Sequence, residues 1–127
     1  MEYTTQTGKS ITVTATDCDK PAHWNPSGNH YRVTIRVNGK RHTFDFWGSY
    51  ADMTQGKPAE LRAALSCFAS DAMAFDNARD VDDFSAEFGY TKPSEAIRAA
   101  YNGCKAARKA AARLGLSRDD LLELADY

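Results

Sequence analysis

Hydrophobic and polar residues alternate along the first part of the chain, with the two-residue period of strands that bury one face. Over residues 10–16, Ile11, Val13 and Ala15 alternate with threonines, which predicts a strand rich in β-branched residues. Residues 17–29 then collect proline, glycine, asparagine and serine. This composition predicts the longest loop of the chain.

The clearest local pattern covers residues 30–47, where two alternating runs are joined by Asn38-Gly39. This dipeptide accepts the positive φ angles of a type I′ turn and predicts a two-residue β-hairpin in which Val37 pairs with Lys40. The register sets apolar side chains on one face, with Ile35 opposite His42, Val33 opposite Phe44 and Tyr31 opposite Phe46. The other face is polar, and it is basic near the turn.

After Pro58 the period of the apolar residues changes to 3.6. One stripe contains Leu61, Leu65, Phe68, Ala72 and Phe75, which predicts an amphipathic helix over residues 58–75. A short helix is predicted over residues 80–88, because acidic residues occupy its first turn and Gly89 can end it.

A third helix is predicted over residues 93–114, opened by Pro93 and stopped by Gly115. Gly103 inside it costs about 1 kcal/mol relative to alanine, and we interpret this cost as a sign of close packing against a neighbour. Ser117 and Asp120 resemble a capping box and predict a last short helix over residues 117–125.

These elements predict a single α+β domain over residues 1–127. A small antiparallel sheet of about three strands lies within residues 1–50, with the hairpin at its centre, and helices from residues 51–127 pack on one face. The predicted core comprises Ile11, Val13, Val33, Ile35, Phe44, Phe46, Leu61, Leu65, Phe68, Ile97 and Tyr101.

Composition narrows the function classes without choosing one. The 127 residues carry a net charge of −1, with 26% charged and 43% hydrophobic residues, so no global charge attracts nucleic acid or membrane. No long apolar run or secretory leader occurs, and we expect the chain to stay in the compartment where it is made. Cys18, Cys67 and Cys104 are odd in number and unpaired in spacing, which predicts free thiols.

Motifs for catalysis or metal binding are missing from the sequence. His23, His30 and His42 match no usual pair of zinc ligands. Asp80, Asp82 and Asp83 lack the alternate spacing and central glycine of a calcium loop, and no phosphate loop, nucleophile elbow or HExxH is present. We therefore expect no enzyme, no metal site and no cofactor.

Charge is nevertheless divided along the chain. Residues 71–87 are acidic, whereas four basic residues of the third helix fall on one arc of its surface: Arg98, Lys105, Lys109 and Arg113. A second basic group lies near the hairpin turn: Arg36, Lys40 and Arg41. The acidic segment and the basic groups are all compatible with ordinary solvated surfaces. Alternatively they are partner surfaces, in which the basic groups bind nucleic acid and the acidic segment binds a basic groove.

An ordered series of motifs extends over residues 30–114. It runs through Arg36-Val37-Asn38-Gly39-Lys40-Arg41, Phe44-Asp45-Phe46-Trp47-Gly48-Ser49, Leu65-Ser66-Cys67-Phe68-Ala69-Ser70-Asp71-Ala72 and Phe84-Ser85-Ala86-Glu87-Phe88-Gly89-Tyr90, then Ser94, Tyr101 and Cys104. In this order the chain resembles a group of small uncharacterised proteins encoded by phages, prophages and other mobile elements. It departs from that group before residue 30 and after Leu114.

The resemblance implies a genomic setting in which small proteins often inhibit host defence systems, as anti-CRISPR proteins do. We therefore expect a cytoplasmic protein of a bacterial host cell that binds and blocks a defence nuclease or a nucleic-acid-guided effector, without catalysis and without a membrane partner. The expected partner-binding residues are Asp76, Asp80, Asp82, Asp83 and Glu87, with Trp47 and Tyr90 as aromatic anchors. Nucleic-acid binding through the two basic groups is the alternative. The sequence defines neither the targeted system nor the oligomeric state.

Overall fold

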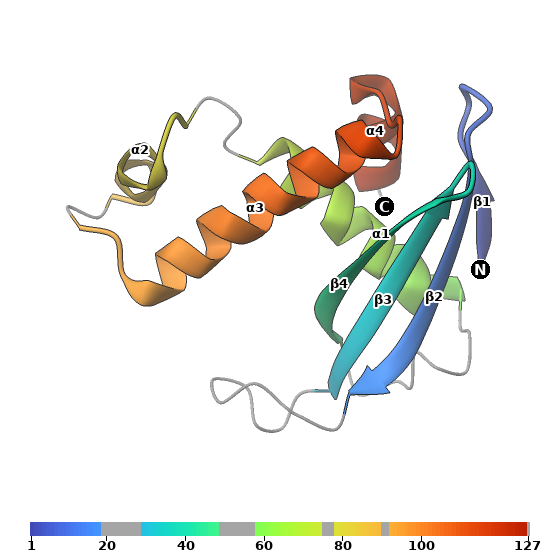
Figure 1. The fold of residues 1–127 in the computed structure, drawn as a ribbon, viewed down its shortest axis with the longest axis horizontal. Coiled ribbons are helices and arrows are strands. Elements are labelled where there is room, and N and C mark those ends of the chain that lie inside the picture. The colour runs from blue at the N-terminus through green and yellow to red at the C-terminus, as the bar shows by residue number, and fades with distance from the viewer. Residues whose placement is uncertain (19–28, 49–57, 75–77, 90–91, 127) are drawn as a thin grey trace.

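The computed structural model describes residues 1–18, 29–48, 58–74, 78–89 and 92–126. These residues form a four-stranded antiparallel sheet and four helices (Figure 1), which confirms the α+β prediction. The strands are β1 (Glu2–Thr4), β2 (Ser10–Cys18), β3 (Asn29–Val37) and β4 (Lys40–Gly48). The helices are α1 (Pro58–Met73), α2 (Val81–Glu87), α3 (Glu95–Arg113) and α4 (Arg118–Ala125).

The β3–β4 hairpin has the predicted register. Val37 pairs with Lys40 and Val33 with Phe44, and the turn residues Asn38 and Gly39 have φ angles of 51° and 80°, as a type I′ turn requires. Its predicted place at the centre of the sheet is wrong, because the strand order is β1-β2-β3-β4. β4 is therefore an edge strand of the described sheet.

The first strand was not predicted. β1 has only three residues and pairs with the beginning of β2, with Tyr3 opposite Ile11. A run of that length holds too few positions to show a two-residue period. The sheet therefore has one strand more than the sequence predicted.

The helix ends follow the capping chemistry of the sequence. Ser94 Oγ accepts a hydrogen bond of 3.2 Å from the Ile97 amide at the start of α3. Gly115, just after the end of α3, has a φ angle of 76°, which a residue without a side chain adopts at no steric cost. Ser117 and Asp120 form the predicted capping box at the start of α4.

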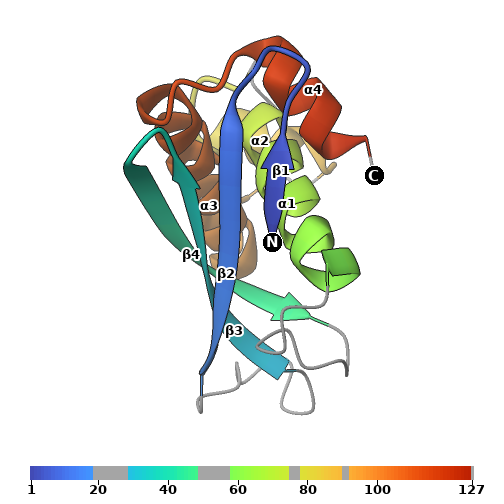
Figure 2. The same cartoon turned by 90° about the vertical axis from the view of Figure 1, so that its right-hand side faces the viewer.

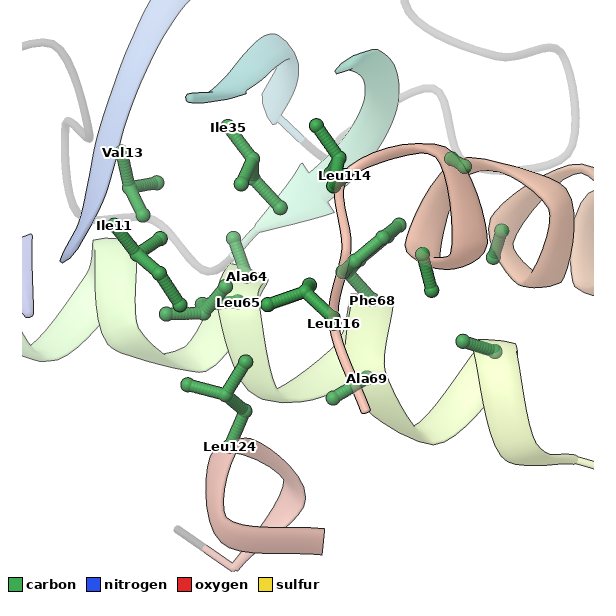
Figure 3. Packing of buried hydrophobic residues seen from close by; sticks show 14 of the residues in the cluster. Ile11, Val13, Ile35, Ala64, Leu65, Phe68, Ala69, Leu114, Leu116 and Leu124 are labelled. Carbon is green, nitrogen blue, oxygen red and sulfur yellow. The ribbon is translucent and has the colours of Figure 1, made fainter. Parts of the chain in front are cut away.

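One face of the sheet is buried beneath helices. Figure 2 shows α1 and α3 behind the strands, and α1 contacts β2, β4, α3 and α4. Leu65 and Phe68 of α1 lie between Ile11 and Ile35 of the sheet and Leu124 of α4 (Figure 3), and all five are at most 2% exposed. Helix α1 thus occupies the middle of the hydrophobic core.

The core prediction is confirmed for Ile11, Val13, Val33, Ile35, Leu61, Leu65 and Phe68, all buried. It is confirmed in part for Phe44 and Phe46, which are partly buried and pack against the core cluster, because β4 is an edge strand. It is wrong for the remaining two residues. Ile97 and Tyr101 are half-buried and lie outside the main cluster, since the first half of α3 does not cover the sheet.

The buried carboxylate of Asp120 connects α4 to the turn between β1 and β2. Asp120 is 1% exposed; it accepts hydrogen bonds from the Thr7 hydroxyl and from the Ser117 amide at 2.9 Å, and its Oδ2 lies 3.3 Å from Lys9 Nζ. Burial alone would raise the pKa of Asp120, but these hydrogen bonds hold it at about 2. The ionised carboxylate therefore stabilises the fold.

We expect Asp120→Asn to lower the free energy of unfolding by about 2 kcal/mol at neutral pH, from the linkage between pKa and stability. The contribution is complete above the unfolded-state pKa of 3.8 and is lost as the pH falls toward the folded-state value of about 2. Urea unfolding between pH 7 and pH 3 should show the gap between the two proteins narrowing at the acid end. Asp119→Asn, at an exposed position of the same helix, is the matched control. A gap that stays constant over this range would contradict the role given to Asp120.

Candidate functional site

Helix α3 is held mainly by its second half. There Ala107, Ala110, Ala111 and Leu114 are buried, and Arg113 Nη1 donates a 2.8 Å hydrogen bond to the Arg41 carbonyl of β4. In the first half of the helix, the residues on the same side as these buried ones are exposed to solvent. Figure 1 shows the first half of α3 reaching away from the sheet toward α2.

This divergence opens a groove of about 930 Å³ between α3, β4 and α1. The β4 wall consists of the four consecutive residues 42–45, and α1 contributes Phe68 and Asp71. The α3 wall is made mostly of small residues: Glu95, Ala96, Ala99, Ala100, Gly103, Ala106 and Ala107. A volume of this size is at the upper end of the range of small-ligand pockets, roughly 300–1,000 Å³.

Three stacked rings form the base of the groove. The centroids of His42 and Phe44 lie 5.9 Å apart, those of Phe44 and Phe68 5.7 Å, and those of His42 and Phe68 5.6 Å. Burial, and secondarily the positive charge of Arg113, lowers the pKa of His42. The imidazole is consequently neutral at neutral pH, so this base is apolar.

The rim of the groove is acidic. Its lining residues include three carboxylates, Asp45, Asp71 and Glu95, and neither lysine nor arginine. Asp45 Oδ1 lies 3.4 Å from Arg32 Nε and 3.2 Å from His30 Nε2. Burial raises the pKa of Asp71, as happens when a carboxylate lacks a compensating cation.

The outer edge of β4 also borders the groove. In the two-residue hairpin Val37 and Lys40 exchange backbone hydrogen bonds, and such pairs alternate along an antiparallel ladder. His42 and Phe44 therefore bond to β3, while the N–H and C=O groups of Thr43 and Asp45 point away from it. The Arg41 carbonyl, two residues before Thr43, faces the same way and meets Arg113.

The structure brings Asp80, Asp82, Asp83 and Glu87 together on and beside α2. Two of these acids already have structural partners. Asp80 is the N-cap and accepts a 2.9 Å hydrogen bond from the Asp83 amide, and Asp83 Oδ2 lies 2.9 Å from Arg79 Nε. This contact lowers the pKa of Asp83. Asp82 and Glu87 are exposed.

The other predicted contact residues are only partly described. Asp76 and Tyr90 lie outside the described residues, and for Trp47 the backbone alone is placed, opposite His30 in β4. An exposed aromatic that was not predicted stands beside the acids: Phe88 is 46% exposed. Phe84, four residues earlier, is buried instead, with its ring 5.5 Å from that of Tyr101.

The two basic groups of the sequence become neighbours in space. The hydrogen bond from Arg113 to Arg41 joins the end of α3 to the hairpin, and Arg36 lies directly opposite Arg41. Arg36, Lys40, Arg41, Arg98, Lys105, Lys109 and Arg113 are all exposed. Arg98 is the exception, because it lies in the first turn of α3, the half of the helix that packs with α2. The acidic α2 lies away from the hairpin (Figure 1), so the charge division of the sequence is only in part a division in space.

No group of three potential metal ligands occurs among the residues that the structure describes. His30 and His42 lie on opposite faces of the hairpin, since His42 packs on Phe68 and His30 faces Asp45. Cys67 and Cys104 are free thiols. Burial, and secondarily the charge of Asp71, raises the pKa of both, so they are protonated at neutral pH.

Comparisons with protein-family models, curated proteins and solved structures give no match to this chain. The resemblance to phage and prophage proteins thus stays a prediction. Within the described part of the chain, none of the helices is long and apolar enough to span a membrane.

The space beside Gly103 overturns the interpretation of that glycine as a close helix contact. A Cβ atom added there would meet nothing within 4 Å.

We therefore expect Gly103→Ala to raise the free energy of unfolding, measured by chemical denaturation, by about 1 kcal/mol, the difference in helix propensity between the two residues. Gly39→Ala, at a φ angle of 80°, should destabilise instead. Destabilisation by Gly103→Ala would mean that the groove is filled in the folded protein.

Proposed function

We propose that this chain is a phage or mobile-element protein that binds and inhibits a host defence nuclease or nucleic-acid-guided effector, in the cytoplasm of a bacterial cell. The observation that carries the proposal is the groove with its apolar base, its acidic rim and a strand edge that no described strand pairs with. Such a surface suits a polypeptide partner. It requires no catalytic group, which agrees with the absence of catalytic motifs from the sequence.

The charge distribution supports a basic partner. Glu95, the first residue of α3, follows α2 in the chain. It adds a negative charge to the groove rim, and the exposed Asp82 and Glu87 add two more on α2. Proteins that hold nucleic acid carry positive grooves, and an acidic surface associates with these quickly. Phe88, exposed among the acids, adds the kind of aromatic anchor that contributes strongly to interfaces.

A tagged form of the protein, used to capture components from a lysate with defence systems, should recover a nuclease or effector whose cleavage it inhibits. Reversing Asp82 and Glu87 together to lysine should weaken that inhibition about tenfold or more, because the acids meet basic residues. We leave Asp80 and Asp83 unchanged, since both stabilise the start of α2.

The matched control reverses two exposed acids, Asp119 in α4 and Asp126 just after it. It should inhibit as the wild type does. Recovery of no defence component, or of one whose activity is unchanged at saturating protein, would reject the proposal. Equal inhibition by both double variants would move the binding surface away from α2.

A second candidate function, nucleic-acid binding, is favoured by the contact between Arg113 and Arg41, which joins two basic groups into one surface. If about four phosphates are neutralised, log K should fall with log salt with a slope near −3.6 on duplex DNA. Titration of a labelled duplex at several salt concentrations measures this slope. Lys105→Glu combined with Lys40→Glu should abolish binding, and equal binding by that variant, or none by the wild type at low salt, would reject this candidate.

A further inference from the structure

The outer edge of β4 has the hydrogen-bonding pattern of an incomplete sheet. Thr43 and Asp45 direct their backbone N–H and C=O groups away from β3, and four consecutive residues of this strand line the groove. Side chains alternate between the two faces of a strand. Residues from both faces of β4 line the groove. The groove must therefore extend along the edge of this strand rather than over one face of the sheet.

Helix α3 overhangs the position that a next strand would take. A fifth strand would lie about 4.8 Å beyond β4, beneath the first half of α3, whose facing residues are alanines and a glycine. Because these side chains are small, they leave room for larger apolar side chains on an incoming strand. Gly103 in particular leaves open space.

Charge complementarity indicates the chemistry of that strand. The lining carries Asp45, Asp71 and Glu95 with no lysine or arginine, and Asp71 forms no ion pair with any described residue. A cation brought into the groove would stabilise its ionised form, since burial disfavours that form at present.

We propose that the groove binds an extended polypeptide segment of the partner as a fifth strand beside β4, with apolar residues at alternate positions and lysine or arginine between them. Main-chain hydrogen bonds to Thr43 and Asp45 give affinity, and the pockets for alternate side chains give specificity. The inference rests on the proposed binding function, but it is tested without the host effector.

The probe is a peptide selected from a displayed library of random ten-residue sequences with the purified protein as bait. Selection should enrich sequences in which apolar and basic residues alternate. The synthetic peptide should bind Thr43→Pro about tenfold or more weakly, because proline removes one outward N–H and leaves a partner carbonyl unpaired. Proline is tolerated on the free side of an edge strand. Thr43→Ala keeps the N–H and removes only the side chain, so it separates the two effects and should bind more tightly than Thr43→Pro.

A second pair of variants tests the helix wall without touching the sheet. Gly103→Leu places a side chain into the groove and should reduce affinity about tenfold or more, the size of effect expected when an apolar contact becomes a clash. Ala112→Leu, on an exposed part of α3 away from the groove, should leave affinity unchanged. Hydrogen exchange of the wild type should slow at the Thr43 and Asp45 amides when the peptide binds.

Three results would overturn the inference: no enriched sequence, equal binding to Thr43→Pro and the wild type, or unchanged exchange at both amides. An enriched helical sequence that binds Thr43→Pro normally would show that a helix occupies the groove instead. Strand addition that is found without any inhibited host effector would reject the proposed function and keep this inference, so the two failures are distinguishable.

Discussion

The packing of α1 is the constraint on which the rest of this structure depends. A sheet with one apolar face must cover it, and α1 does so with Leu61, Leu65 and Phe68, all at most 2% exposed. The same helix contacts α3 and α4. Alanines lie on both sides of the α1–α3 contact, with Ala69 and Ala72 on α1 and several buried alanines on α3, which lets the two helices approach closely.

The groove results from the way α3 packs against α1. α3 has 19 residues, about 28 Å at 1.5 Å per residue, and only its second half is buried against the core. Arg113 fixes its end on the hairpin, while α2 packs on its first half through the rings of Phe84 and Tyr101. The first half is thereby held beside the edge strand without covering it. The groove is therefore a direct consequence of the fold.

The sequence predicted most local structure because local chemistry decides it. The Asn38-Gly39 turn sets the register of β3 and β4, and Ser94, Gly115 and Ser117 mark helix ends by capping. The packing of these elements against one another was harder to predict from the sequence. Nothing in the alternation of Phe44 and Phe46 reveals that β4 is an edge strand. The sequence of α3 likewise does not show that Tyr101 packs on Phe84 of α2 rather than on the sheet.

The site was predicted only in part for the same reason. The acids of α2 were visible as a charged segment, but the cap formed by Asp80 and the ion pair of Asp83 with Arg79 exist only in the folded chain. The groove itself could not be predicted from the sequence, because its lining residues lie far apart in the chain. A glycine in the middle of an alanine-rich helix, Gly103, was the one available signal. The sequence predicted close packing there, but the position faces open space.

The groove and the strand-addition proposal both require that the outer edge of β4 is open in the free protein, and amide hydrogen exchange measures this residue by residue. In an open edge strand, the amides of His42 and Phe44, bonded to β3, should exchange slowly, whereas those of Thr43 and Asp45 should exchange quickly. This alternation along one strand is the expected result. Slow exchange at all four amides would show that the edge is already covered, and would contradict both the groove and the binding functions built on it.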